Sequence, residues 1–86
     1  MKEDSPDLRF STHALDMLEE RGIETEWAYR TIGDPELVQS ALDGTMHYLR
    51  PIEERGGRWL RVVVNVRVVP PRVVTLFFDR RLGRKS

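Results

Sequence analysis

The sequence contains no cysteine. This absence excludes disulfides, thiolate zinc sites and a cysteine nucleophile. No stretch approaches the roughly 20 apolar residues of a membrane-spanning helix, and the acidic N-terminus is unlike a signal peptide. The two histidines stand in no metal-ligand spacing, and no glycine-rich phosphate loop occurs. We therefore expect a cytoplasmic protein that needs no membrane, metal or cofactor.

The chain has 86 residues, which is enough for one domain but not for two hydrophobic cores. Its first residues are polar and include a proline, and its last residues are mostly basic. We expect a flexible N-terminus over residues 1–9, a single α+β domain over residues 10–79 and a basic C-terminal tail over residues 80–86.

The net charge is zero, but the charges are unevenly distributed along the chain. Residues 1–45 carry four basic and eleven acidic residues, whereas residues 46–86 carry ten basic and three acidic ones. One interpretation is an arginine-rich C-terminal half that faces nucleic acid. The other is that acidic helices neutralise an arginine-rich sheet, and the sequence leaves both open.

Residues 12–21 are predicted to form a helix that carries the clearest local signals in the chain. Ser11 is a suitable N-cap, and Gly22 can end the helix because glycine enters the left-handed region cheaply. Phe10 and Leu15 occupy the positions of a hydrophobic staple. We expect Leu15 to face the core together with Ala14 and Leu18.

The rest of the chain changes from helical to extended periodicity after residue 35. Thr25 is predicted to cap a second helix over residues 26–32, and Asp43-Gly44 is a strong hairpin signal. The predicted strands span residues 36–42, 45–52, 59–69 and 72–78, and the third, rich in β-branched residues, should be central. We expect two N-terminal helices packed on one face of a four-stranded, antiparallel, twisted sheet, with the other face open.

Several motifs resemble one family. His13-Ala14, followed by Glu20-Arg21-Gly22-Ile23, is similar to the opening of the family called domain of unknown function 4258. Later matches are Asp34-Pro35-Glu36-Leu37-Val38, the strand beginning Gly57-Arg58-Trp59-Leu60 and the closing Val74-Thr75-Leu76-Phe77. The resemblance covers about Phe10 to Phe78.

The resemblance implies the fold of RelE-like and barnase-like ribonucleases and of toxins in toxin–antitoxin pairs. It therefore implies a metal-independent endoribonuclease acting on RNA, and an acidic antitoxin that would dock between Arg58 and Lys85. Two positions depart from the family pattern. Met17 stands where the family often has arginine, and Phe77 where it often has tyrosine.

Metal-independent RNA cleavage needs a base for the 2′-hydroxyl proton and cations for the phosphate. His13 is our candidate base, Arg21, Arg58 and Arg61 are candidate phosphate ligands, and Thr75 is a candidate hydrogen-bond donor. Glu20, two helical turns after His13, could orient its ring. Further candidate RNA-binding residues are Arg50, Arg72, Arg80, Arg81 and Tyr48.

Each of these residues also has a structural interpretation. His13 could fix the helix to the sheet, Arg21 could pair with groups at the helix end, and His47 could lie on a solvated strand face. Tyr48, Trp59 and Phe78 could stack on bases or simply pack in the sheet. The alternative function is a non-catalytic member of the fold that binds a protein partner or small ligand on the open sheet face. A homodimer is also compatible with the sequence.

Overall fold

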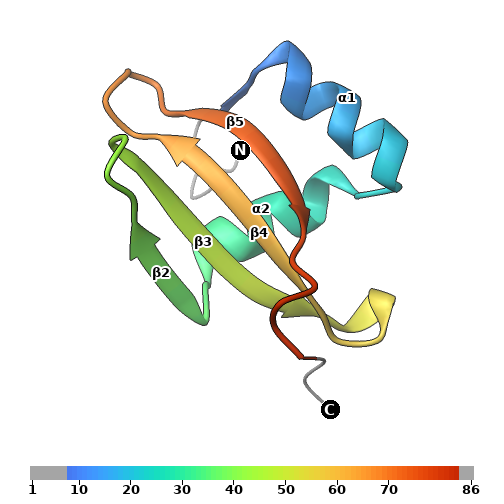
Figure 1. The fold of residues 1–86 in the computed structure, drawn as a ribbon. Helices are drawn as coiled ribbons and strands as arrows, with labels where there is room; N and C mark the ends of the chain where they lie inside the picture. Colours follow the sequence, from blue (N-terminus) through green and yellow to red (C-terminus); the bar gives the residue numbers. More distant parts are fainter. Residues whose placement is uncertain (1–7, 84–86) are drawn as a thin grey trace.

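A five-stranded mixed sheet forms one layer of the computed structural model, which describes residues 8–83 (Figure 1). The elements are, in order, β1 (Arg9–Phe10), α1 (Thr12–Arg21), α2 (Thr25–Gly33), β2 (Leu37–Ser40), β3 (Thr45–Ile52), the 3₁₀ turn η1 (Glu53–Arg55), β4 (Arg58–Asn65) and β5 (Arg72–Phe78). The strand order is β1-β5-β4-β3-β2, with β1 parallel to β5 and the other pairs antiparallel.

The predicted four-stranded antiparallel sheet was wrong, because β1 adds a parallel strand and places both helices between strands. β1 has only two residues, too few to show an alternating pattern. It is held by backbone hydrogen bonds from Arg9 N to Pro71 O (3.0 Å) and from Ser11 N to Val73 O (2.9 Å). Leu8, just before it, is buried. Within the predicted flexible and basic ends, residues 1–7 and 84–86 lie outside the described part of the chain.

α1 confirms the predicted bounds and caps. The Oγ of Ser11 accepts a hydrogen bond from the backbone N–H of Ala14, and Gly22 ends the helix in the left-handed region with φ of 63°. The prediction that Leu15 faces the core was wrong, because its side chain is 52 % exposed. Ala14 is buried and Leu18 packs against the core, as predicted, and Met17 also packs there.

α2 begins at Thr25, so Glu24 rather than Thr25 is the N-cap, and no side chain caps this helix. Trp27 and Ala28 are buried. Thr31 is also fully buried, and its hydroxyl donates a hydrogen bond to the carbonyl oxygen of Trp27 at 2.8 Å. This local hydrogen bond lets a polar residue lie in the core.

β4 lies at the centre of the sheet, as predicted, but it ends at Asn65 instead of continuing to Val69. The side-chain oxygen of Asn65 accepts from the backbone N–H of Arg67 at 3.0 Å and turns the chain out of the sheet. Val66 and Val69 are consequently exposed. The predicted hairpin at Asp43-Gly44 is confirmed between β2 and β3.

Both helices contribute to one core on a single face of the sheet. α2 lies behind β3 and β4 in the view of Figure 1, and α1 runs alongside β5. The core consists of the buried side chains Leu8, Ala14, Ile23, Trp27, Ala28, Ile52, Leu60, Val62, Val64, Val73 and Leu76. No helix of the described residues is long and apolar enough to cross a membrane.

A bulge in β5 determines how α1 meets the sheet. Val63 pairs with Thr75 and Val64 with Val73, so Val74 has no partner on β4. Its carbonyl oxygen accepts instead from the Oγ of Ser11 at 3.0 Å. One serine hydroxyl therefore caps α1 and fixes its N-terminus to the bulge.

Because Gly22 has a positive φ, we expect substitution by alanine to change the stability of the protein differently at Gly22 and at Gly33. Gly22→Ala should lower the free energy of unfolding by about 1–2 kcal/mol, because alanine is strained at positive φ. The nearest atom to an added Cβ is Arg55 Nη1 at 3.8 Å, so crowding contributes little. Gly33→Ala is the control, since its Cβ would meet nothing within 4 Å. It should be neutral or up to about 1 kcal/mol stabilising. Urea unfolding of both variants checks this, and equal effects would contradict it.

Candidate functional site

A groove of about 620 Å³ lies where the C-terminal half of α1 meets the end of β5. Because β1 pairs only with the first residues of β5, the later part of β5 is a free edge beside α1. The groove is lined by Met17, Arg21, Arg55, Arg58, Phe77, Phe78 and Arg80. Four of these seven side chains are arginines, and they come from α1, η1, β4 and the turn after β5.

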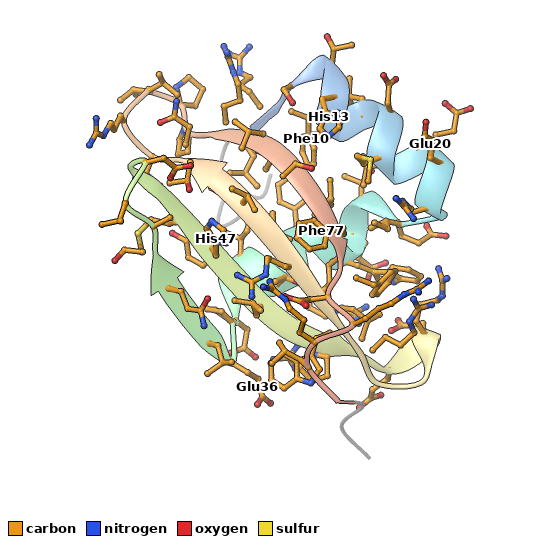
Figure 2. The ribbon with its side chains drawn as sticks, viewed as in Figure 1. Phe10, His13, Glu20, Glu36, His47 and Phe77 are labelled. Atoms are coloured by element: carbon orange, nitrogen blue, oxygen red, sulfur yellow. The ribbon has the colours of Figure 1, made fainter. Side chains whose placement is uncertain are left out.

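His13 lies on the first turn of α1, two turns before Arg21. Its side chain is exposed, and its Nε2 lies 3.1 Å from the Oγ1 of Thr75 on β5. Figure 2 shows His13 near the start of the helix, Phe77 on the neighbouring strand and Glu20 near the helix end. No described contact joins Glu20 to His13; Thr75 is the group that holds the ring. The structure therefore brings the predicted pair His13 and Thr75 together.

Arg55 holds the C-terminal end of α1 against the sheet. Its Nη1 donates to the carbonyl oxygens of Gly22 (3.1 Å) and Arg21 (3.5 Å), which complements the negative end of the helix dipole. Its guanidinium also lies 4.9 Å from the ring centre of Phe78. Arg55 lies between two of the predicted strands, and no local pattern indicated its role, because its partners lie about 33 residues earlier in the chain.

Arg58 and Arg80 complete the basic wall of the groove. The guanidinium of Arg58 lies 4.9 Å from the ring centre of Phe78, on which Arg55 also rests. Arg21 and Arg80 are exposed. Within residues 8–83, none of the four groove arginines forms an ion pair with a carboxylate. Their charges are thus available to an anion.

Arg61, predicted to hold phosphate, is placed elsewhere. It is 8 % exposed on the sheet face opposite the helices, where its Nε and Nη2 both bind Asp79 Oδ2 at 2.8 Å. Its Nη1 donates to Gln39 Oε1 and to His47 Nδ1. All three nitrogens are therefore engaged within the protein. The structure does not bring Arg61 to the groove.

His47 is half-buried and belongs to this same network rather than to a solvated strand face. Because Arg61 donates to Nδ1 at 2.8 Å, the ring proton lies on Nε2, which contacts Thr45 Oγ1 at 3.2 Å. Thr45 in turn donates to Asp43 Oδ1 at 2.7 Å. Burial, and then the charge of Arg61, lower the pKa of His47. The network therefore disfavours the protonated form of this histidine.

The other predicted RNA-binding residues are dispersed. Arg81 lies next to the groove but pairs with Asp79, whose pKa is held below its usual range by Arg81 and by Arg61. Arg50 donates to the carbonyl oxygen of Asp34 at 2.7 Å, beyond α2. Arg72 lies at the far end of β5, opposite Arg9. Tyr48 packs against the core. Of the predicted set, Arg80 alone lines the groove.

Residues 10–78 match the model of the domain of unknown function DUF4258. The chain belongs to this family. The DUF4258 segment includes His13, Thr75 and every groove residue except Arg80, which follows it by two positions. No protein of curated function and no solved structure matches the chain significantly. In this DUF4258 protein, no three histidine and carboxylate side chains of the described residues lie together as metal ligands.

The lowered pKa of His47 predicts a pH-dependent stability. In the folded protein His47 binds a proton less readily than in the unfolded chain, where its pKa is about 6.5. As the pH falls below about 6.5, the unfolded chain therefore binds more protons than the folded protein, and the free energy of unfolding decreases. This contribution is present above that pH and is lost toward the lower pKa of the folded state. His47→Gln should remove the decrease between pH 7 and about 5, where carboxylates titrate little.

The other histidine of the chain is the matched control. His13→Ala removes one histidine but leaves the contacts of His47 intact, so the decrease caused by His47 should persist. Urea unfolding at closely spaced pH values measures the difference. A decrease that persists in His47→Gln would show that another group causes it.

Proposed function

We propose that this chain is a metal-independent endoribonuclease of the toxin type, which holds a strand of RNA in the groove between α1 and β5. The observation that supports this proposal is the exposed His13, 3.1 Å from Thr75 and one helical turn before Met17. Met17 lines the groove together with four arginines that pair with no carboxylate of residues 8–83. A base and a cationic track on one seam are what cleavage of a phosphodiester requires.

In the proposed reaction, the 2′-oxygen of the RNA attacks the adjacent phosphorus. His13 Nε2 takes the 2′-hydroxyl proton, the 2′-oxygen–phosphorus bond forms and the bond from phosphorus to the 5′-oxygen breaks. Arginine cannot give up a proton, so the leaving oxygen takes one from water. The hydroxide that remains takes the proton from His13, which regenerates the water and the base. The products are a 2′,3′-cyclic phosphate and a free 5′-hydroxyl. Thr75, released from His13, donates to a phosphate oxygen.

In the proposed reaction, the groove arginines stabilise the negative charge on the phosphate. The length of α1 sets the distance between His13 and Arg21. His13 and Arg21 are eight residues apart, which corresponds to about 12 Å along α1. The long side chain of Arg21 can reach back toward the scissile phosphate, while Arg58 and Arg80 would hold the following part of the strand. Arg55 both carries charge and keeps the helix end in place.

Met17 favours a second candidate function. It lines the groove one turn after His13 and one turn before Arg21, so an apolar side chain separates the candidate base from the cations. The family resemblance leads us to expect arginine there and tyrosine at Phe77. Without them, the groove could bind an anionic partner, such as an acidic antitoxin, or a small ligand without cleaving anything.

His13→Ala separates the two functions. Under the ribonuclease proposal, the cleavage rate measured in EDTA should fall by about 10²–10⁴-fold, because a general base is lost. RNA binding should persist, since the arginines remain. His47→Gln is the control and should cleave at the rate of the wild type. Intact RNA at high wild-type concentration would overturn the proposal, and equal cleavage by His13→Ala would exclude His13 as the base.

Met17→Arg tests whether the groove holds phosphate. An added cation in the groove should tighten binding of a 2′-O-methyl RNA hexamer and steepen its dependence on log salt by about 0.7, because one more counterion contact is made. Leu15→Arg is the control, with the same charge on the same helix at an exposed position. Fluorescence anisotropy at several salt concentrations measures both. Equal slopes for the two variants would contradict binding in the groove.

A further inference from the structure

A second cavity of about 500 Å³ adjoins the groove at the end of β5. Its lining consists of Arg58, Trp59, Phe78, Asp79, Arg80, Leu82 and Gly83. It shares Arg58, Phe78 and Arg80 with the groove, so the two spaces meet at a pair of cations. We call it the Trp59 pocket.

Two aromatic side chains line this pocket, and only that of Trp59 is available to a ligand. Phe78 is occupied, because it packs edge-on against Trp27 with ring centres 6.5 Å apart and carries the guanidinium groups of Arg55 and Arg58. Trp59 is partly exposed, and no ring or cation–π contact of the described residues involves it. Its indole can therefore pack against an incoming flat group.

The charge of the pocket also suits an anionic ligand with an apolar part. Asp79 contributes a carboxylate, but Arg61 and Arg81 both bind it and neutralise its charge. The cations at the junction, Arg58 and Arg80, have no carboxylate partner in residues 8–83. Leu82, on the turn closed by its N–H to Asp79 O, adds an apolar wall.

We propose that the Trp59 pocket binds one nucleobase of a single-stranded RNA, stacked on Trp59, while Arg58 and Arg80 hold the phosphate next to it. This inference rests on the proposed function and names its substrate class. An aromatic face beside cations is the usual means of binding single strands, since every base has a face to stack and every nucleotide a phosphate. A base in a duplex is already stacked and cannot enter.

Four affinities test the pocket, using two proteins and two ligands. The proteins are the wild type and Trp59→Ala, and the ligands are a 2′-O-methyl RNA hexamer and an abasic hexamer with the same phosphates. Neither ligand has the 2′-hydroxyl needed for cleavage. Removal of the bases should weaken wild-type binding on the order of tenfold. It should weaken Trp59→Ala binding by much less, because the stacking ring is already gone.

Two further variants guard against an unfolding artefact. Trp59→Phe keeps a ring and should keep the preference for the hexamer with bases. Val69→Ala removes an apolar group that is 96 % exposed in the β4–β5 loop and should behave as the wild type. Should Trp59→Ala fail to fold, Trp59→Leu takes its place as the variant without a ring.

The outcomes separate this inference from the proposed function. An equal effect of base removal in both proteins would overturn the pocket, even if the chain cleaves RNA. Failure of the wild type to bind either hexamer would overturn both proposals. Tight binding of a deca-glutamate peptide that Trp59→Ala weakens, with equal affinities for the two hexamers, would overturn the pocket in favour of an acidic protein partner.

Discussion

The buried ion pair between Arg61 and Asp79 constrains everything that surrounds the end of β5. Both groups are almost fully buried, so each depends on the other and on further hydrogen bonds for the solvation it has lost. Removal of one partner from such a pair typically costs about 3–5 kcal/mol. Asp79 therefore fixes the turn that follows β5, and this turn places Arg80 in the groove and Leu82 in the Trp59 pocket.

The same ion pair explains why Arg61 was predicted as a site residue although its role in the structure is to stabilise the fold. Arg61 lies in a strand with a motif of the family, and its charge matches the chemistry of phosphate binding. Its guanidinium is nevertheless shared among Asp79, Gln39 and His47, and none of these is near it in sequence. Arg55 is the converse, since it lies in a turn without any motif and yet connects α1, Phe78 and the groove.

Features that depend on interactions between residues close in sequence could be predicted, and features that depend on distant residues could not. The bounds of α1 depend on Ser11 and Gly22, which act within a few residues, and both were predicted. β1 depends on hydrogen bonds to residues about 62 positions later, and the bulge at Val74 depends on pairing with β4. Neither leaves a local pattern, so the parallel strand was missed. His13 and Thr75 were predicted as site residues, but their contact across the seam was visible only in the structure.

The bulge in β5 also determines where Met17 lies relative to His13 and the groove arginines. Because the hydroxyl of Ser11 binds the carbonyl oxygen of Val74, the start of α1 is held at the bulge of β5. His13 is thereby placed at Thr75, and Met17 between it and the arginines. The groove is thus lined by arginines and by the thioether of Met17, and His13 lies one helical turn before Met17, outside the lining. The proposed ribonuclease function therefore requires that a phosphate bound by the groove arginines extend past Met17 toward His13.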